Sequence, residues 1–352
     1  MTRSYVIYIV PIMLLAIMAL LPSFMRLGSE PLPGPLSGSD SLFEGRPPDI
    51  PSQGQDQPGT LRQRSASGVT FMVPCTEKDV DILPWRIKHM MTYHRYDFQE
   101  RVFVVDTRGK PLSEDLVAVL ESIIRSGLMD SWAMVNYSRA YVDYVKKRAG
   151  WKTELTTMGR IGNLVYFFML DKCQTKYLCH FDLDIVMWSR PDFSWVETAV
   201  RILQGNPQAL TVVPPRPHMV ENESWTDRFT CGGPFFISAR YYTIDKTRYD
   251  RLLDDSNTRA SFPTCSGDVH WERLTSCLAC SAGLKKINML ESRQAWVLHF
   301  PSPRNQSGDM RLVLDRLVSK GIAITESKQK PYNAAKLSLW VDALARHDNP
   351  SA

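Results

Sequence analysis

Short β-branched and aromatic segments alternate with helical segments between residues 69 and 188 of this 352-residue chain. The predicted strands span residues 69–76, where Pro74 is expected to end the first strand, 101–107, 132–138 and 176–188. The predicted helices span residues 79–94, 113–127 and 159–173, and the second has Ser113 as a cap and Gly127 as a stop. Strands that alternate with helices build a largely parallel sheet covered by helices on both faces, so we predict an α/β fold.

Carboxylates stand at the ends of two of these strands. Asp106 ends "VFVVD", and Asp182 and Asp184 interrupt the apolar run "LCHFDLDIVMW". In open α/β sheets, ligands bind at the carboxyl ends of the strands. Alternation along a strand predicts that Asp182 and Asp184 point the same way, where their charges would repel unless a cation held them. We therefore predict a hard divalent metal ion at this pair, and the alternative is an exposed strand end with two solvated carboxylates.

The N-terminal region differs from the rest of the chain. Residues 5–25 carry no charge and are about long enough to span a bilayer, with Arg3 before them and Arg26 after them. A cleaved signal peptide is the competing interpretation, although "LPSFM" is a poor cleavage site. Residues 26–67 are rich in Pro, Gly, Ser and Gln, which is typical of a flexible stem. The predicted organisation is a short tail at 1–4, a transmembrane anchor at 5–25, a disordered stem at 26–67 and one catalytic domain at 68–350.

Charge and cysteine content exclude some classes of protein. The chain has a modest net charge of +5, and its basic residues are spread along the sequence, so we expect no nucleic-acid binding. The chain has 7 cysteines, an odd number, which leaves at least one thiol free or paired with another chain. Cys277 and Cys280 form a lone C-x-x-C, a weak signal for zinc. N-x-S sequons begin at Asn136, Asn222 and Asn305 and, together with the anchor, favour a secretory lumen.

An ordered set of segments resembles the glycosyltransferases of the GT-A fold, in particular family-two-like members with a D-x-D motif and a type II membrane anchor. These segments are "FMVPCTEKD", "VFVVDT", "GRIGNLVYFFMLDKCQTKYLCHFDLD", "CGGPFFIS", "SGDVHWERLTSCLACSAGLK" and "WVLHFP". The resemblance covers about residues 69–303. It implies a Rossmann-like, mostly parallel sheet, a nucleotide-sugar donor, expected to be UDP-linked, and Mn²⁺ or Mg²⁺ as cofactor. The acceptor would be a hydroxyl on a glycan, protein or lipid.

The resemblance also implies roles for individual residues. The nucleotide would contact Pro74, Thr76, Glu77, Asp106, Arg160, Asn163 and Asp182. Asp184 would hold the metal ion, with Asp182 and His299 assisting. Asp268 would act as the base of an inverting reaction, with Glu272 in reserve.

Several alternatives stay open. His299 lies in an apolar strand and could be a structural histidine, and Asp268 opens a helical stretch and could be an N-cap. Inverting members usually show two adjacent acids where this chain has Ser266-Gly267-Asp268, and "DIVMW" is similar to retaining transferases. An inverting enzyme is our prediction; a retaining enzyme and an inactive membrane-tethered sugar-binding protein are the alternatives.

The surroundings of the site and its compartment are also predicted. Trp225, Phe229, Phe235 and Phe236 could stack on sugar faces, and the loop at 214–229 is assigned to the acceptor region. The expected location is the Golgi membrane with a lumenal catalytic domain, or the inner membrane if the source is bacterial.

Overall fold

The computed structural model describes residues 67–149, 164–215, 237, 239–254, 271–289, 293–299 and 308–321. The chain divides after Pro51 into two units, and every described residue belongs to the second, Ser52–Ala352. The predicted anchor at 5–25 and nearly all of the stem at 26–67 lie outside the described residues. Within the described ranges, no helix has the length and apolar character needed to cross a membrane.

A seven-stranded sheet in the order β3-β2-β1-β4-β7-β6-β8 forms the centre of this unit. Its strands are β1 Val69–Cys75, β2 Glu100–Val105, β3 Ser131–Met134, β4 Tyr177–Phe181, β6 Ala209–Val213, β7 Tyr241–Asp245 and β8 Lys285–Asn288. β7 runs antiparallel to both of its neighbours, and the other described strand pairs of the sheet are parallel. β5 (Ile185–Ser189) and β9 (Ala295–His299) form a separate antiparallel pair. The predicted α/β class with a mostly parallel sheet is confirmed; the more specific GT-A assignment stays a prediction.

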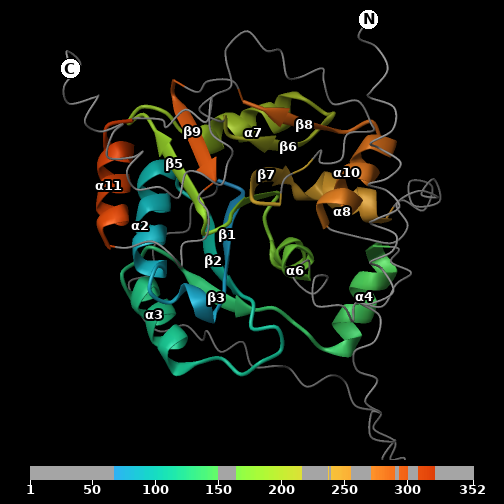
Figure 1. Ribbon diagram of the computed structural model, residues 1–352. Helices are drawn as coiled ribbons and strands as arrows, with labels where there is room; N and C mark the ends of the chain where they lie inside the picture. Colours follow the sequence, from blue (N-terminus) through green and yellow to red (C-terminus); the bar gives the residue numbers. More distant parts are fainter. Residues whose placement is uncertain are drawn as a thin grey trace, which may run out of the picture. The chain divides into compact units, whose positions relative to one another are not determined.

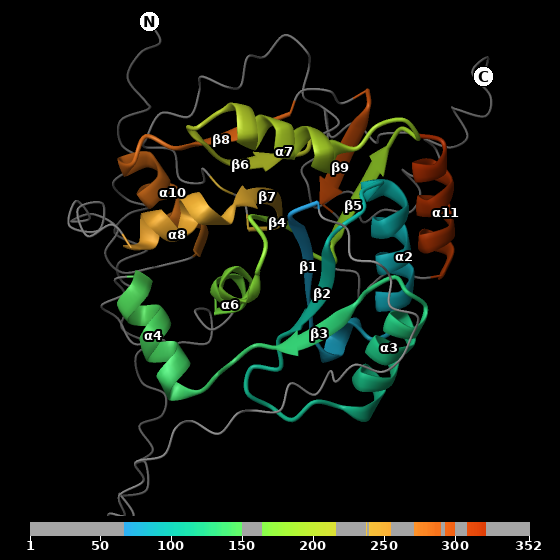
Figure 2. The same ribbon diagram turned by 180° about the vertical axis from the view of Figure 1, so that it is seen from behind.

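Helices lie on both sides of the central strands. They are α2 Leu83–His94, α3 Glu114–Arg125, α4 Arg139–Ala149, α6 Leu164–Lys172, α7 Trp195–Gly205, α8 Lys246–Asp254, α10 Trp271–Ser281 and α11 Gly308–Ser319, with a short 3-10 helix η2 at Glu77–Asp79. Figures 1 and 2 show α2, α3 and α11 to one side of β1 and β2, and α4, α6, α8 and α10 to the other. The ends predicted for α3 are confirmed: the hydroxyl of Ser113 accepts the N–H of Leu116 at 3.2 Å, and Gly127 follows with φ 74°.

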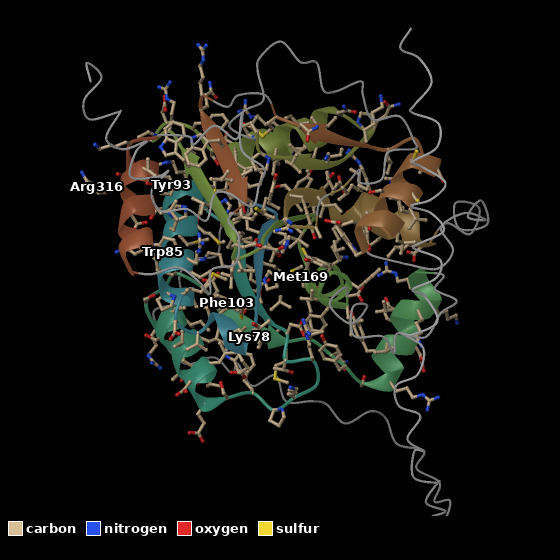
Figure 3. The ribbon with its side chains drawn as sticks, viewed as in Figure 1. Lys78, Trp85, Tyr93, Phe103, Met169 and Arg316 are labelled. Carbon is tan, nitrogen blue, oxygen red and sulfur yellow. The ribbon has the colours of Figure 1, made fainter. Side chains whose placement is uncertain are left out.

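The central strands have apolar sequences because they are buried in the core. Strands covered on both faces need apolar side chains at successive positions, and β2 is buried from Arg101 to Val105. Phe103 of β2 and Met169 of α6, both labelled in Figure 3, have 0% exposure. On the α2 side, the indole N–H of Trp85 donates to the carboxylate of Asp315 in α11 at 3.0 Å, a contact between helices far apart in sequence.

The prediction of a single strand over residues 176–188 is wrong. β4 ends at Phe181 and β5 begins at Ile185 in the other sheet, so Asp182–Leu183–Asp184 is a turn. The N–H of Ile185 donates to the carbonyl of Asp182 at 3.1 Å and closes this turn. Aspartate favours turns because its side chain competes with the regular ladder. The alternation argument for the directions of Asp182 and Asp184 therefore does not apply.

Candidate functional site at the carboxyl ends of β1 and β4

The order of the strands marks one edge of the sheet as the place for a ligand. From β1 the chain builds β2 and β3 on one side, and then β4 pairs with the opposite side of β1. The carboxyl ends of β1 and β4 therefore flank a topological switch point, where open α/β sheets bind ligands. Asp182 and Asp184 follow β4 directly at this edge, and Asp106 follows β2.

Pro74 marks where β1 and β4 separate. The prediction that Pro74 ends the strand is wrong, because β1 continues to Cys75. β1 pairs with β4 only as far as Met72, whereas it pairs with β2 as far as Cys75. The carbonyl of Cys75 accepts the N–H of Asp106, on the β2 side, so position 74 faces the β4 side beyond the last paired residue. A proline, which has no N–H, is therefore tolerated in a central strand here. Beside the turn that carries Asp182 and Asp184, β1 and β4 no longer pair with each other.

His180 holds the first aspartate. Its ring is fully buried, with Nδ1 at 3.2 Å from the carbonyl oxygen of Met72 and Nε2 at 3.1 Å from Oδ1 of Asp182. A carbonyl oxygen only accepts, so Nδ1 carries a proton, and the second contact requires one more proton on either the imidazole or the carboxyl group. Burial raises the pKa of Asp182, and the nearby Asp184 carboxylate adds to the rise while His180 opposes it. The contact with His180 anchors Asp182 to the end of β4.

Arg240 holds the second aspartate. This residue immediately precedes β7, and its Nη1 donates to Oδ2 of Asp184 at 3.1 Å. The carbonyl of Arg240 also accepts the N–H of Asp182 at 2.7 Å. Arg240 therefore contacts both aspartates of the D-x-D turn, one through its backbone and the other through its side chain.

An aromatic group lies behind His180. The ring of Tyr166 in α6 makes edge contact with His180 at 5.7 Å between centroids and lies 5.4 Å from the ring of Trp271 in α10. Burial raises the pKa of Tyr166 far above its usual range, with a further rise from the carboxylates of Asp182 and Glu272. The phenol therefore stays neutral beside the acidic turn. Sequence reasoning missed His180, Arg240 and Tyr166, because no spacing rule links α6, β4 and the residue before β7.

Asp106 is held by its own loop and by a tyrosine that follows β3. It is 8% exposed, and its Oδ1 accepts the hydroxyl of Tyr137 at 2.5 Å and the N–H of Arg108 at 3.1 Å. Arg108 has φ 53°, the left-handed conformation that non-glycine residues rarely adopt. Burial, together with the hydrogen bond to Asp106, raises the pKa of Tyr137, so this phenol remains a donor. Asp106 is thus held in place at the carboxyl end of β2, and its contact with the nucleotide stays a prediction.

Thr76 and Glu77, predicted to contact the nucleotide, have hydrogen-bond partners within the protein: a local one for Thr76 and a distant one for Glu77. Thr76 caps η2, with its N–H and hydroxyl donating to Asp79 Oδ2 at 2.9 and 2.8 Å. Oε1 of Glu77 accepts the N–H of Ser113 at 2.8 Å, and Oε2 accepts the hydroxyl of Ser113. Glu77 thus binds the N-cap residue of α3.

The remaining predicted residues are placed in part. His299 is the last residue of β9 and pairs with Ile185, so its backbone lies opposite the residue that follows Asp184. Among the described side chains, no three His, Cys, Asp or Glu residues are grouped closely enough to hold a metal ion; the position of the His299 side chain is not described. Glu272 lies in the first turn of α10, where Oε1 accepts the N–H of Ala239 at 2.5 Å.

Other predicted residues lie outside the described part of the chain. These are Arg160, Asn163, Asp268, Trp225, Phe229, Phe235 and Phe236.

The cysteines give no metal site at the C-x-x-C. Cys280 is disulfide-bonded, and Cys277 is a free thiol. A disulfide sulfur does not supply the thiolate that zinc requires. Cys75, at the end of β1, is fully buried, and burial together with Asp79 and Asp106 raises the pKa of its thiol far above the usual range. Cys75 is therefore not an activated nucleophile, although it lies at the candidate site.

No protein-family model matches the chain, and no curated protein sequence matches it. Similar solved structures include a mannosyltransferase from Pyrobaculum calidifontis in complex with GDP-Man and Mn²⁺, at 14% identity over 81% of this chain and 76% of that chain, with a TM-score of 0.41. Core-mannan synthase A from Aspergillus fumigatus in its Mn/GDP form matches at 11% identity over 86% and 91% of the two chains, with a TM-score of 0.39. The galactosyltransferase LgtC matches at 11% identity over 78% and 95%, also with a TM-score of 0.39. At these identities and TM-scores, the similarity transfers neither activity nor residue roles to this chain.

Proposed function

We propose that this protein is a metal-dependent glycosyltransferase that moves a sugar from a nucleotide-sugar donor to a hydroxyl acceptor. One observation carries the proposal: two aspartates occupy the turn that leaves β4 at the switch point of a mostly parallel sheet. The D-x-D resemblance of the sequence supports the same activity. A UDP-linked sugar is the donor we expect, and a glycan, protein or lipid is the acceptor.

The donor set fits Mn²⁺ or Mg²⁺. Hard divalent ions take carboxylate oxygens, and Mn²⁺ also accepts an imidazole nitrogen. Asp182 and Asp184 would supply the oxygens, and the backbone of His299 lies close enough in register to make it the third ligand we propose. When bound, the ion neutralises negative charge on the diphosphate leaving group.

The residues of the chain would share the remaining work. Asp106, Arg160 and Asn163 would bind the nucleotide, and Asp182 would hold either a ribose hydroxyl or the ion. Asp268 would take the proton of the acceptor hydroxyl in an inverting transfer, with Glu272 as the reserve base. A retaining transfer needs no such base, so the two mechanisms differ in what Asp268 does.

We also propose an N-terminal anchor at 5–25, a stem at 26–67 and a lumenal domain at 68–350 in the Golgi membrane. The uncharged stretch and the Pro- and Gly-rich segment after it support this topology. Carbonate extraction and protease protection of the full chain in membranes test it: release into the soluble fraction would contradict the anchor.

A panel of nucleotide-sugars tests the activity. The full chain is incubated with UDP- and GDP-linked sugars in Mn²⁺, in chelator, and in chelator followed by excess Mn²⁺. A glycosyltransferase usually hydrolyses its donor slowly without acceptor, so we expect Mn²⁺-dependent release of nucleotide from at least one donor. Binding of sugar without turnover of any donor would favour the inactive sugar-binding protein, and failure to bind any nucleotide-sugar would contradict the proposal.

A further inference from the structure

Arg240 connects the D-x-D turn to the antiparallel strand of the sheet. Its carbonyl accepts the N–H of Asp182 at 2.7 Å, and its guanidinium pairs with Asp184 at 3.1 Å. The side chain of Arg240 is 44% exposed and that of Asp184 is 25% exposed. The backbone of Arg240 is thus fixed by the sheet, while its long side chain reaches the solvent-facing edge of the site.

The guanidinium and a metal ion compete for the same carboxylate. A divalent ion on Asp184 brings two further positive charges beside a group that remains charged at any pH of interest. The ion pair with Asp184 is partly exposed, and pairs of this kind contribute little, so separating them costs little free energy. The guanidinium is 44% exposed, so once its pair with Asp184 is weakened it can approach another anion at the same edge.

A diphosphate is the partner that best fits this geometry. Arginine presents a planar fork of donors that matches phosphate oxygens, and a diphosphate bound at the same edge would bring such oxygens beside Asp184. Another exposed arginine–aspartate pair, Arg190–Asp192 at 3.0 Å, serves as a comparison. This pair follows β5, away from the carboxyl ends of β1 and β4, so we do not expect it to contact a diphosphate there.

We propose that Arg240 is a diphosphate-binding residue whose pair with Asp184 gives way to contacts with the donor's phosphates when a metal ion binds Asp184. This inference rests on the proposed function, since it requires a nucleoside diphosphate and a divalent ion at the same edge. It assigns Arg240 two opposite effects. The side chain weakens the binding of metal ion alone and strengthens the binding of nucleoside diphosphate with metal ion.

The two effects are separable by equilibrium binding to the full chain. Free Mn²⁺ is measured by electron paramagnetic resonance, and binding of UDP, GDP, UMP and uridine in saturating Mn²⁺ is measured by calorimetry. The variants are Arg240→Ala, Arg240→Lys and the control Arg190→Ala, with melting temperatures to verify folding. For Arg240→Ala we expect Mn²⁺ to bind severalfold more tightly, because the competing cation is gone. Diphosphate affinity should fall about tenfold or more, as for the loss of a hydrogen bond to a charged group.

The pattern across variants and probes decides the case. Arg240→Lys should lie between wild type and Arg240→Ala, Arg190→Ala should equal wild type, and uridine affinity should not change. Unchanged diphosphate affinity in a folded Arg240→Ala protein would overturn the inference, as would weaker binding of Mn²⁺, which would mean that Arg240 only orients Asp184. If Mn²⁺ alone binds too weakly to measure in both proteins, the diphosphate comparison decides. If wild type binds neither UDP nor GDP with Mn²⁺, the proposed function itself fails.

Discussion

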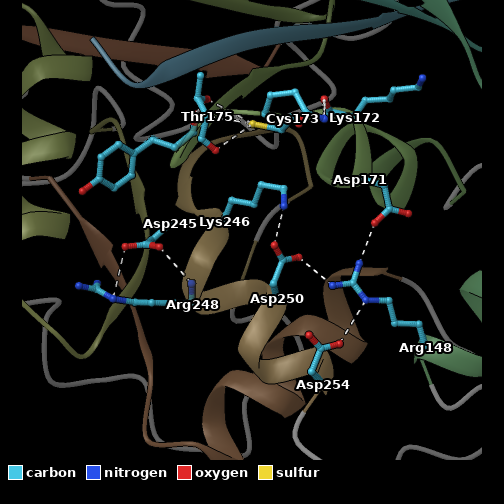
Figure 4. A network of polar contacts seen from close by, with 12 residues as sticks. Arg148, Asp171, Lys172, Cys173, Thr175, Asp245, Lys246, Arg248, Asp250 and Asp254 are labelled. Atoms are coloured by element: carbon cyan, nitrogen blue, oxygen red, sulfur yellow. Dashed lines mark hydrogen bonds and ion pairs between the residues drawn. The ribbon is translucent and has the colours of Figure 1, made fainter. Parts of the chain in front are cut away.

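Two groups of aspartates lie at opposite ends of the strands of the same sheet. At the carboxyl end of β4, Asp182 and Asp184 pair with His180 and Arg240. At the amino end, where β7 leads into α8, Asp171 and Asp250 surround Arg148, with Asp254 at the margin (Figure 4). Both groups are acidic, and each has an arginine of the chain paired with at least one of its aspartates.

The difference lies in how each cation is held. Arg148 of α4 is 18% exposed and contacts aspartates of α6 and α8 at 2.7 and 2.9 Å, while Lys246 pairs with Asp250 at 2.5 Å. Arg240 pairs with Asp184 at 3.1 Å, and its side chain is 44% exposed. The first arrangement joins three helices, so its cation belongs to the fold. The second arrangement leaves the guanidinium of Arg240 near solvent at the proposed ligand edge, so the carboxylate of Asp184 can exchange partners. Paired aspartates alone therefore do not indicate a metal site; the place of Asp182 and Asp184 in the sheet is what favours the proposed site.

The largest effect is expected from Asp184→Asn. Loss of one carboxylate charge removes the proposed metal ligand, so transfer should fall below detection while the melting temperature changes little. Asp250→Asn is the matched control at the amino edge and should lower stability but keep transfer at low temperature. In wild type, chelator should stop transfer and Mn²⁺ should restore it. Full sugar transfer by Asp184→Asn, or transfer by wild type that is unaffected by chelator, would contradict the proposal that Asp184 binds a metal ion while Asp250 only stabilises the fold.

Asp268→Asn tests the base. Asparagine caps helices about as well as aspartate, so stability should hold while transfer falls by roughly a hundredfold or more, the scale of a lost general base. Glu272→Gln keeps an oxygen for the N–H of Ala239 and should be close to wild type. Rates, donor affinity and melting temperature are measured for both variants. Near-normal transfer in Asp268→Asn with a large loss in Glu272→Gln would move the base to Glu272, and normal transfer in both would favour a retaining reaction.

The parts of the fold that could be predicted from sequence are those set by local pattern. The caps of α3 and the apolar runs of β1 and β2 depend on neighbours in the chain, and the structure agrees with them apart from the strand end expected at Pro74. The break between β4 and β5 was missed because both halves are apolar, and only pairing with β9, more than a hundred residues away, separates them.

The candidate site shows the same limit. Asp182 and Asp184 could be identified because charge is costly in an apolar run, whereas their partners could not. His180 resembles any buried histidine, and Arg240 becomes a neighbour only through the antiparallel pairing of β4 with β7. Roles that depend on such tertiary pairing leave no periodic signal in the sequence.

Arg148→Ala should have a smaller effect, and on stability rather than activity. The variant leaves Asp171 and Asp250 partly buried without their shared guanidinium, so the free energy of unfolding should fall by about 2–3 kcal/mol. Burial already raises the pKa of Asp171, and removing Arg148 should raise it further. Urea unfolding measures the loss, and donor affinity at low temperature should equal wild type. Arg240→Ala should show the reverse pattern, with less than about 1 kcal/mol lost in stability.

The smallest effect is expected from Glu77, an acidic residue that follows β1 at the carboxyl edge and yet has a structural partner. Both of its oxygens accept from Ser113 at the start of α3, where a negative charge is favoured by the exposed N–H groups and the helix dipole. Glu77→Gln keeps the shape but loses the charge, so stability should fall by no more than about 1 kcal/mol.

If Glu77 acts only on α3, Mn²⁺-dependent UDP affinity will be unchanged, and Ser113→Ala will show a similar loss of stability. If Glu77 instead contacts the nucleotide, as the resemblance implies, UDP affinity will change in Glu77→Gln and not in Ser113→Ala. Calorimetry and thermal unfolding of the two variants thus decide whether a carboxylate at the ligand edge belongs to the site or to the fold.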